Sequence, residues 1–189
     1  MPNDPRLFKK MKTSNKVKAK GPSPEDQLLA MAEDRYWTIV FADPEHPTLF
    51  EKFQEDDIFY DRLNAFKNAL QTYGPISKNL PDFRHNQGAA KGRVFHGHIH
   101  NKNGGTYVLE WAPIDKQRRI IVLLQLGTHE NYKFQQTPVS TEACEAILNN
   151  EINQSMMKRA AQKIVEAKNK VKRVNDYYRN KEASSCYNH

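Results

Sequence analysis

The sequence predicts an α+β fold: a four-stranded, mostly antiparallel sheet with two N-terminal helices and a long C-terminal helical extension. Residues 120–126 are apolar except for one Gln, which suits a strand covered on both faces. Shorter segments before it are rich in β-branched and aromatic residues, and apolar residues recur at spacings of three and four over residues 49–73 and 147–174. A chain of 189 residues, 38% of them apolar, can build one domain with a real core.

The N-terminal third is predicted to hold an arm, one strand and helices. Residues 1–24 combine Lys, Pro, Gly and Ser with little to bury, which predicts a disordered arm. A short helical pattern covers 25–33, and the aromatic segment 36–42 predicts the first strand. Apolar residues then recur at helical spacing up to Gly74, which predicts two helices or one bent helix. These residues are Leu49, Phe53, Phe59, Leu63, Phe66, Ala69, Leu70 and Tyr73.

The remaining strands follow a predicted loop over residues 74–92. The Gly-containing sequence NKNGG at 101–105 predicts a turn between two antiparallel strands, and Pro113 with Asp115 predicts the end of the second of them. The last three strands are predicted over 93–100, 106–114 and 118–126, the last of them stopping at Gly127.

The C-terminal region is predicted as one long helix that begins at Ser140 and carries a thin apolar stripe. Two interpretations remain open: the stripe packs along the sheet edge or a partner, or the basic helix binds RNA. The predicted regions are a basic arm (1–24), the main domain (25–137), a helical extension (138–181) and a tail (182–189).

The net charge of +7 is distributed unevenly. Residues 1–20 and 151–181 each carry a net charge of +6, whereas the stretch 25–61 holds 11 acids and two bases. The stretch 84–119 holds seven bases and two acids. This separation favours a polyanion on one face, and nucleic acid is the commonest polyanion inside cells.

Several classes of protein are disfavoured by composition. Only Cys144 and Cys186 are present, too few for a disulfide framework, and no Cys spacing suits a metal. No segment approaches the roughly 20 apolar residues of a membrane helix, and residues 1–20 lack the apolar core of a signal peptide. We therefore expect a cytoplasmic protein with no membrane partner.

Five of the seven histidines lie between residues 85 and 129. Side chains alternate along a strand, so His96, His98 and His100 are predicted to share one face. The antiparallel arrangement would bring His129 near this face and His85 to its rim. The five histidines are His85, His96, His98, His100 and His129.

Two chemistries suit such a cluster. Three histidines at alternate strand positions can bind zinc or another divalent ion. Alternatively, imidazoles that titrate near neutral pH can serve as base and acid in RNA cleavage by the 2′-hydroxyl, while cations stabilise the phosphorane. Arg84, Lys91 and Arg93 suit that cationic role, and Tyr132 and Phe134 can stack on a base.

Short motifs over residues 36–134 resemble the RelE/ParE toxin superfamily, with YafQ-like or YafO-like mRNA interferases the most similar branches. The motifs are Arg84-His85-Asn86-Gln87-Gly88, Lys91-Gly92-Arg93, His98, and Gly127-Thr128-His129 followed by Tyr132 or Phe134. The resemblance implies a RelE-like fold and a cytoplasmic bacterial toxin that cleaves mRNA without a cofactor. Such toxins often act on the ribosome and are neutralised by a cognate antitoxin.

The predicted site divides the residues by role. His85, His98 and His129 are the catalytic candidates, and His96 and His100 are possible additional members. The RNA-binding candidates are Arg84, Lys91, Arg93, Tyr132 and Phe134. The YafQ-like pattern has an acid shortly after the strand histidine, and this chain has none there, which leaves His100 or Glu110 as substitutes.

Two non-catalytic functions compete with the nuclease. ParE-type relatives share the fold but bind the protein DNA gyrase, and they generally lack a histidine cluster. A basic RNA-binding module without catalysis is the other alternative.

Overall fold

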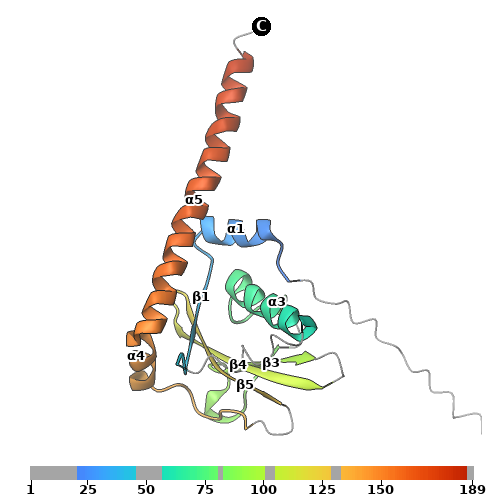
Figure 1. Cartoon of the computed structure of the whole chain (residues 1–189), viewed down its shortest axis with the longest axis vertical. Coiled ribbons are helices and arrows are strands. Elements are labelled where there is room, and N and C mark those ends of the chain that lie inside the picture. The colour runs from blue at the N-terminus through green and yellow to red at the C-terminus, as the bar shows by residue number, and fades with distance from the viewer. Residues whose placement is uncertain (1–20, 46–56, 81–82, 101–104, 129–132, 187–189) are drawn as a thin grey trace, which may run out of the picture.

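A computed structural model of the chain describes residues 21–45, 57–80, 83–100, 105–128 and 133–186, and it confirms the α+β class with a long C-terminal helix (Figure 1). One five-stranded sheet has the order β1-β5-β4-β3-β2. Its strands are Thr38–Phe41 (β1), Phe83–His85 (β2), Phe95–His100 (β3), Thr106–Asp115 (β4) and Ile120–Thr128 (β5). The helices are Pro24–Ala32 (α1), Asp57–Tyr73 (α3), Thr141–Asn149 (α4) and Glu151–Cys186 (α5), with a 3₁₀ turn at Gly88–Ala90 (η2).

The sheet differs from the predicted four-stranded one in two ways. β1 runs parallel to its neighbour β5, whereas the other three pairs are antiparallel, so the sheet is mixed. β2 lies inside the segment that we predicted as a loop, and it pairs with β3. A strand of three residues shows no alternation long enough to recognise, and only the neighbouring strand reveals it.

β4 ends at Asp115, which agrees to within one residue with the strand predicted over 106–114, and Pro113 lies inside it. The pairing of β4 with β5 is irregular between Pro113 and Asp115. A proline is tolerated at such an irregularity because the regular ladder of hydrogen bonds is already interrupted there.

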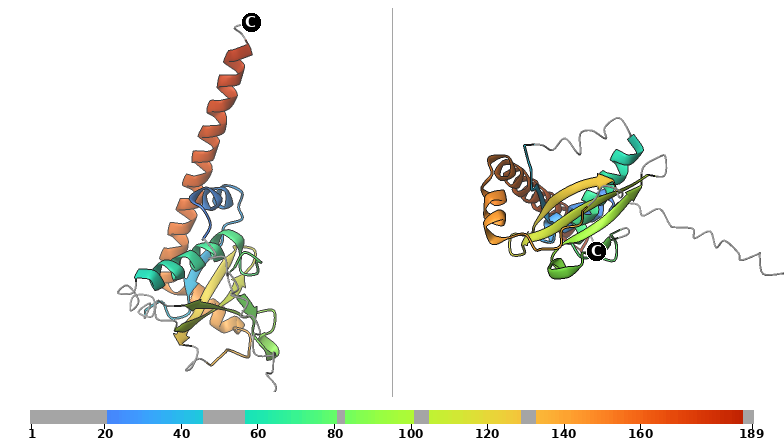
Figure 2. Two further views of the ribbon diagram at one scale, coloured as in Figure 1. Left: turned by 90° about the vertical axis from the view of Figure 1, so that its right-hand side faces the viewer. Right: turned by 90° about the horizontal axis from the view of Figure 1, so that it is seen from below.

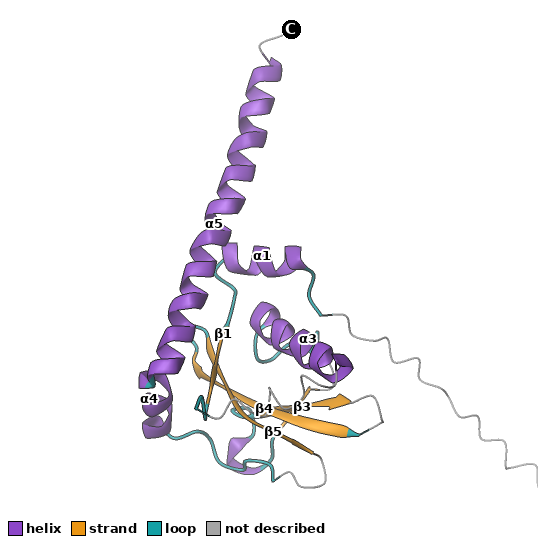
Figure 3. Cartoon of the chain, in the orientation of Figure 1, coloured by secondary structure: helices purple, strands orange, loops and turns teal. Residues whose placement is uncertain are grey.

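α3 covers one face of the sheet and buries the larger apolar core (Figure 3). Apolar residues recur along α3 at spacings of three and four, as the sequence predicts. Phe66 and Trp111 meet edge to face with ring centroids 5.3 Å apart, and the Trp111 indole donates a hydrogen bond to the Pro75 carbonyl at 3.1 Å. Residues 49–56, which belong to the predicted helical segment, lie outside the described residues.

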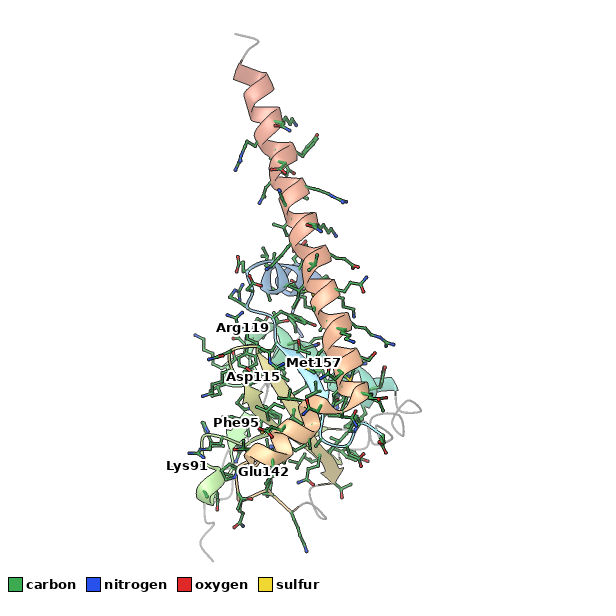
Figure 4. The ribbon with its side chains drawn as sticks, turned by 90° about the vertical axis from the view of Figure 1, so that its left-hand side faces the viewer. Lys91, Phe95, Asp115, Arg119, Glu142 and Met157 are labelled. Atoms are coloured by element: carbon green, nitrogen blue, oxygen red, sulfur yellow. The ribbon has the colours of Figure 1, made fainter. Side chains whose placement is uncertain are left out.

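The opposite face carries a second core at the β1 end of the sheet. There Val40, Ala112 and Val122 pack against Ile147 of α4, with Met157 of α5 beside them. Figure 4 shows Met157 between α5 and the sheet. The predicted helical extension therefore contributes apolar residues to the core of the domain.

The C-terminal helical region is two helices, which corrects the prediction of one. Ser140 caps α4 as predicted, and its hydroxyl accepts a hydrogen bond from the Ala143 amide. The chain breaks at Asn150, whose backbone is extended, and the Asn150 side chain accepts hydrogen bonds from the amides of Ile152 and Asn153. Asn150 thus serves as the cap of α5, a role that favours asparagine.

Asn153 joins α5 to the outer edge of β1. Its side-chain oxygen accepts a hydrogen bond from the Phe41 amide at 3.1 Å, and its side-chain nitrogen donates to the Phe41 carbonyl at 2.9 Å. The same nitrogen donates to the Ile147 carbonyl at 2.9 Å. One buried side-chain amide therefore makes the backbone hydrogen bonds at the β1 edge that a neighbouring strand would otherwise make.

α1 precedes the sheet and packs across α5 instead of joining α3 on the sheet (Figure 2). Ser23 caps this helix with a capping box closed by Asp26. Within the described part of the chain, every helix is too short or too polar to cross a lipid bilayer.

Replacing Gly97 by Ala is expected to destabilise the domain. A methyl group at position 97 would lie 2.5 Å from the Phe66 ring, and that ring is 2% exposed and held against Trp111. We expect the free energy of unfolding in denaturant to fall by about 1–3 kcal/mol, as for other overpacked cores. In a Phe66→Leu background the same substitution should cost less, and an equal cost in both backgrounds would refute the contact as the cause.

Replacing Asn153 by Ala should also destabilise the domain, because it removes both hydrogen bonds between the Asn153 side chain and the Phe41 backbone. The expected loss is about 1–3 kcal/mol of unfolding free energy, measured by denaturant titration. Asn169→Ala on the exposed surface of α5 is the matched control, and it should be neutral or slightly stabilising because Ala favours helices.

Candidate active site

β3 places His96, His98 and His100 on the sheet face away from α3. Phe95 and Ile99, which alternate with them, belong to the apolar core under α3. The ring centroids of His96 and His98 are 5.5 Å apart, with the rings nearly perpendicular. His96 is buried, His98 is half-buried and His100 is exposed. We call this surface the histidine face.

Glu110 lies on the histidine face directly opposite His96 in the register of β3 and β4. Its side chain is fully buried. Its two oxygens accept hydrogen bonds from three N–H groups: the Asn86 side chain, the Gln125 side chain at 2.8 Å and the Gln135 backbone at 2.9 Å. A buried acid is costly unless such donors surround it, so these three contacts make its position tolerable.

Asn86 connects Glu110 to His96. The Asn86 side-chain nitrogen donates to a Glu110 oxygen and to the Gln135 carbonyl, the latter at 2.8 Å. Both its protons are then used, so the Asn86 side-chain oxygen must face His96 Nδ1, which lies 2.7 Å away. This oxygen can only accept, so the network assigns the proton to Nδ1 and leaves the lone pair of a neutral His96 ring on Nε2.

A β-bulge brings Gln125 to this network. Glu110 pairs with Gln125, but the next residue of β4, Trp111, pairs with Leu123, so Leu124 is an extra residue in β5. The bulge turns Gln125 to the histidine face, where strict alternation would have directed it into the apolar core under α3. Bulges are common next to active sites because they redirect a side chain in this way.

The chain after β5 crosses the histidine face. The Gln125 side chain donates to the Lys133 carbonyl at 3.1 Å, and the Ala90 amide donates to the Gln136 carbonyl at 2.8 Å. Between these anchors the Phe134 ring lies 4.5 Å from the His96 ring, centroid to centroid. Phe134, predicted to contact a base of RNA, therefore packs against His96 in this structure.

The structure separates His85 from the other histidines. In the register of β2 and β3, His85 pairs with Phe95 and Arg84 pairs with His96. Paired residues point to the same side of a sheet, so Arg84 lies beside the histidine face and His85 lies on the opposite face. The His85 ring is 5.0 Å from the Phe95 ring, which agrees with this placement.

Two more predicted cations lie at the start of β3. Lys91 and Arg93 are exposed on the turn that follows η2, and Figure 4 shows Lys91 on the η2 turn, at the far end of the domain from the tip of α5. His100 is exposed, with Nδ1 3.0 Å from the Thr106 hydroxyl, and its carbonyl accepts a hydrogen bond from Arg62. His129 and Tyr132 lie outside the described residues.

The metal interpretation finds no complete set of ligands in the described part of the chain. There, no three His, Cys, Asp or Glu side chains lie close enough together to hold a metal ion. The three strand histidines alternate along about 13 Å of β3, which is long for a single ion.

The sequence did not lead us to predict the residues that hold His96 in place. Asn86, Gln125 and Gln135 hold Glu110 and, through Asn86, His96. The available signal was a single polar residue in each of two apolar strands, Glu110 between Leu109 and Trp111 and Gln125 between two leucines. Isolated polar residues in buried strands must pair with something, and these two pair with each other.

Comparison with known proteins adds no assignment: no family model matches this chain, and no curated protein or solved structure matches it. The resemblance to RelE/ParE toxins thus depends on short motifs and stays a prediction. The function must be argued from the site.

Glu110→Gln should destabilise the domain, because an amide offers only one accepting atom where the carboxyl group offers two. At least one of the three donors from Asn86, Gln125 and Gln135 would then face another N–H group. We expect the free energy of unfolding to fall by about 1–3 kcal/mol in urea titrations. Glu145→Gln, at an exposed position of α4, is the control, and an equal effect of both variants would contradict this role of Glu110.

Proposed function

We propose that this chain is a metal-independent endoribonuclease, an mRNA interferase toxin that cleaves RNA through attack by the 2′-hydroxyl. The observation that carries the proposal is the pair formed by His96 and His98, in which one ring is held in a fixed orientation and the other is half-exposed beside it. Acid–base RNA cleavage needs two groups of this kind close to one phosphate.

In this proposal His96 and His98 supply the two proton transfers. A neutral His96 has its lone pair on Nε2, because Asn86 holds the proton on Nδ1, so His96 suits the base. His98, the more exposed ring, suits the acid that protonates the leaving 5′-oxygen. His129 follows β5 in sequence and remains a third candidate on the basis of the Gly-Thr-His motif.

Arg84 is the cation best placed to bind the phosphate. It lies beside His96 in the sheet register and its side chain is exposed, so it can approach a phosphate held next to the pair. Lys91 and Arg93, further along the same edge, would bind the neighbouring phosphates of the strand. The opposite placement of His85 removes it from the proposed catalytic group.

The proposed partners follow from the same resemblance. They are mRNA, the ribosome on which such toxins often act, and a cognate antitoxin protein. No cofactor is required, since imidazole and guanidinium groups supply the whole chemistry. A gyrase-binding toxin is less well supported, because binding a protein gives no reason for a buried network that orients His96.

Cleavage of purified mRNA, with and without ribosomes and with EDTA, tests the proposal. We expect cleavage that EDTA does not abolish, and His96→Ala and His98→Ala should each lower its rate by about 10²–10⁴-fold, the usual contribution of a general acid or base. Intact RNA under every condition would overturn the nuclease proposal, and cleavage lost only in EDTA would restore the metal interpretation.

His85→Ala is the matched control, since His85 belongs to the same cluster in the sequence but lies on the other face of the sheet. It should leave the cleavage rate nearly unchanged. Loss of cleavage in His85→Ala with activity retained in His96→Ala and His98→Ala would refute the site while leaving the function intact. Each variant should first be shown to unfold at the same denaturant concentration as the wild type.

A further inference from the structure

The C-terminal half of α5 extends beyond the rest of the domain. Residues 168–181, which we call the projecting segment, begin beside α1, where Lys168 pairs with Asp34, and rise past α1 and away from the sheet (Figures 1 and 2). At 1.5 Å per residue, these 14 residues span about 21 Å. All of their side chains are exposed except Val171, which is half-buried.

An apolar stripe continues along α5 into the projecting segment. Its residues alternate at spacings of three and four, a repeat that keeps them on one side of a helix. The lower part is covered: Met157 packs with the sheet core and Ala167 is 5% exposed. The upper part is not, since Val174 is 46% and Tyr178 is 59% exposed. The stripe comprises Met157, Ala160, Ile164, Ala167, Val171, Val174 and Tyr178.

Cations border this stripe on both sides. The projecting segment carries six Lys or Arg residues and one Asp, a net charge of +5. From the helical period, Lys170 and Lys181 lie along one side of the stripe, and Lys168, Lys172 and Arg179 lie along the other. Figure 4 shows side chains extending outward from the upper turns of α5.

The chain itself shows what covers the stripe lower down. α1 and the two residues after it carry four acids and no base, and α1 packs against α5 where the stripe begins to emerge. Ala30 of α1 is fully buried, and Asp34 forms an ion pair with Lys168 at 2.7 Å. A short acidic helix with a small apolar face therefore already occupies the adjoining part of the stripe.

We propose that the stripe on the projecting segment is a docking surface for a partner protein that presents an acidic amphipathic helix. The proposed interface continues the contact between α1 and α5. Its apolar stripe would pack against the apolar face of the partner helix, and the flanking cations would pair with acidic residues on that helix. A second copy of this chain is a poor occupant, because two projecting segments would bring like charges together. RNA would use the cations and could stack on Tyr178, but it gives no reason for the aliphatic Val174 or for the continuous apolar stripe.

Binding can be measured with a synthetic three-heptad peptide that carries Leu at its a and d positions and Glu at its e and g positions. Fluorescence anisotropy of the labelled peptide is followed during titration with the full chain at about 50 and 200 mM salt. We expect saturable binding that weakens with salt, and a mass in solution that corresponds to one copy of the chain.

Three double variants separate the contribution of the apolar stripe to binding from that of the flanking cations. Val174→Ser with Tyr178→Ser keeps the charge but removes the apolar stripe, and it should weaken peptide binding at least about tenfold. Lys170→Gln with Arg179→Gln keeps the stripe, and it should weaken binding less and reduce its salt dependence. Lys158→Gln with Arg159→Gln removes the same charge from exposed positions off the stripe and should change little.

A labelled RNA of about 20 nucleotides serves as the competing probe. The proposal is overturned if the peptide does not bind, if the Ser variant binds the peptide as well as the wild type does, or if RNA binds with the sensitivity to the Ser substitutions that we expect for the peptide. A concentration-dependent dimer that the Ser substitutions abolish would assign the stripe to self-association instead. None of these measurements involves RNA cleavage. A negative result would therefore refute the docking surface without bearing on the proposed nuclease.

Discussion

The need to satisfy the buried Glu110 side chain governs the arrangement of the histidine face. An acid in the middle of a sheet costs several kcal/mol unless N–H groups surround it. Its three donors come from three separate parts of the chain: the loop after β2, strand β5 and the segment after β5. Each donor requires a local departure from regular structure, and together these departures build the surroundings of His96.

The bulge in β5 and the crossing segment are the clearest of these departures. If β5 alternated strictly through Leu124, the side chain of Gln125 would point into the apolar core under α3. Without the crossing segment, Glu110 would lack the Gln135 amide and His96 would lack Phe134 above it. The hydrogen bonds that Glu110 requires therefore fix the position of the His96 ring, although the two side chains are not bonded to each other directly. Asn86 carries that influence from Glu110 to His96.

The sequence alone predicts those features that depend on periodicity. The alternation of β3 places three histidines together, and the apolar run of β5 identifies a strand buried on both faces. Features that depend on contacts between distant segments cannot be predicted in this way. β2 is defined only by its pairing with β3, and the opposite placements of Arg84 and His85 follow from that register. The break at Asn150 did leave a signal in the sequence, because asparagine is favoured at helix caps and unfavourable inside helices.

The lower part of the α5 stripe packs against the sheet, and we propose that the upper part binds a partner protein. Asn153 fixes the position of the upper part relative to the sheet. Because Asn153 bonds to both backbone groups of Phe41, the helix is fixed to the β1 edge of the sheet and cannot swing freely about its base. The stripe residue Tyr178 lies 25 residues further on, or about 38 Å along the helix axis. The histidine face lies toward the other edge of the sheet, where β3 pairs with β2.

This geometry limits what a docked partner can do. A helix bound only at the tip of α5 would not reach His96 and His98, since the strand that carries them is separated from β1 by β5 and β4. Control of the histidine face by such a partner would require a second segment that reaches down past α1 to the sheet. Anchoring by the tip would then raise the local concentration of that segment at the site, so that even a weak contact there would suffice to block it.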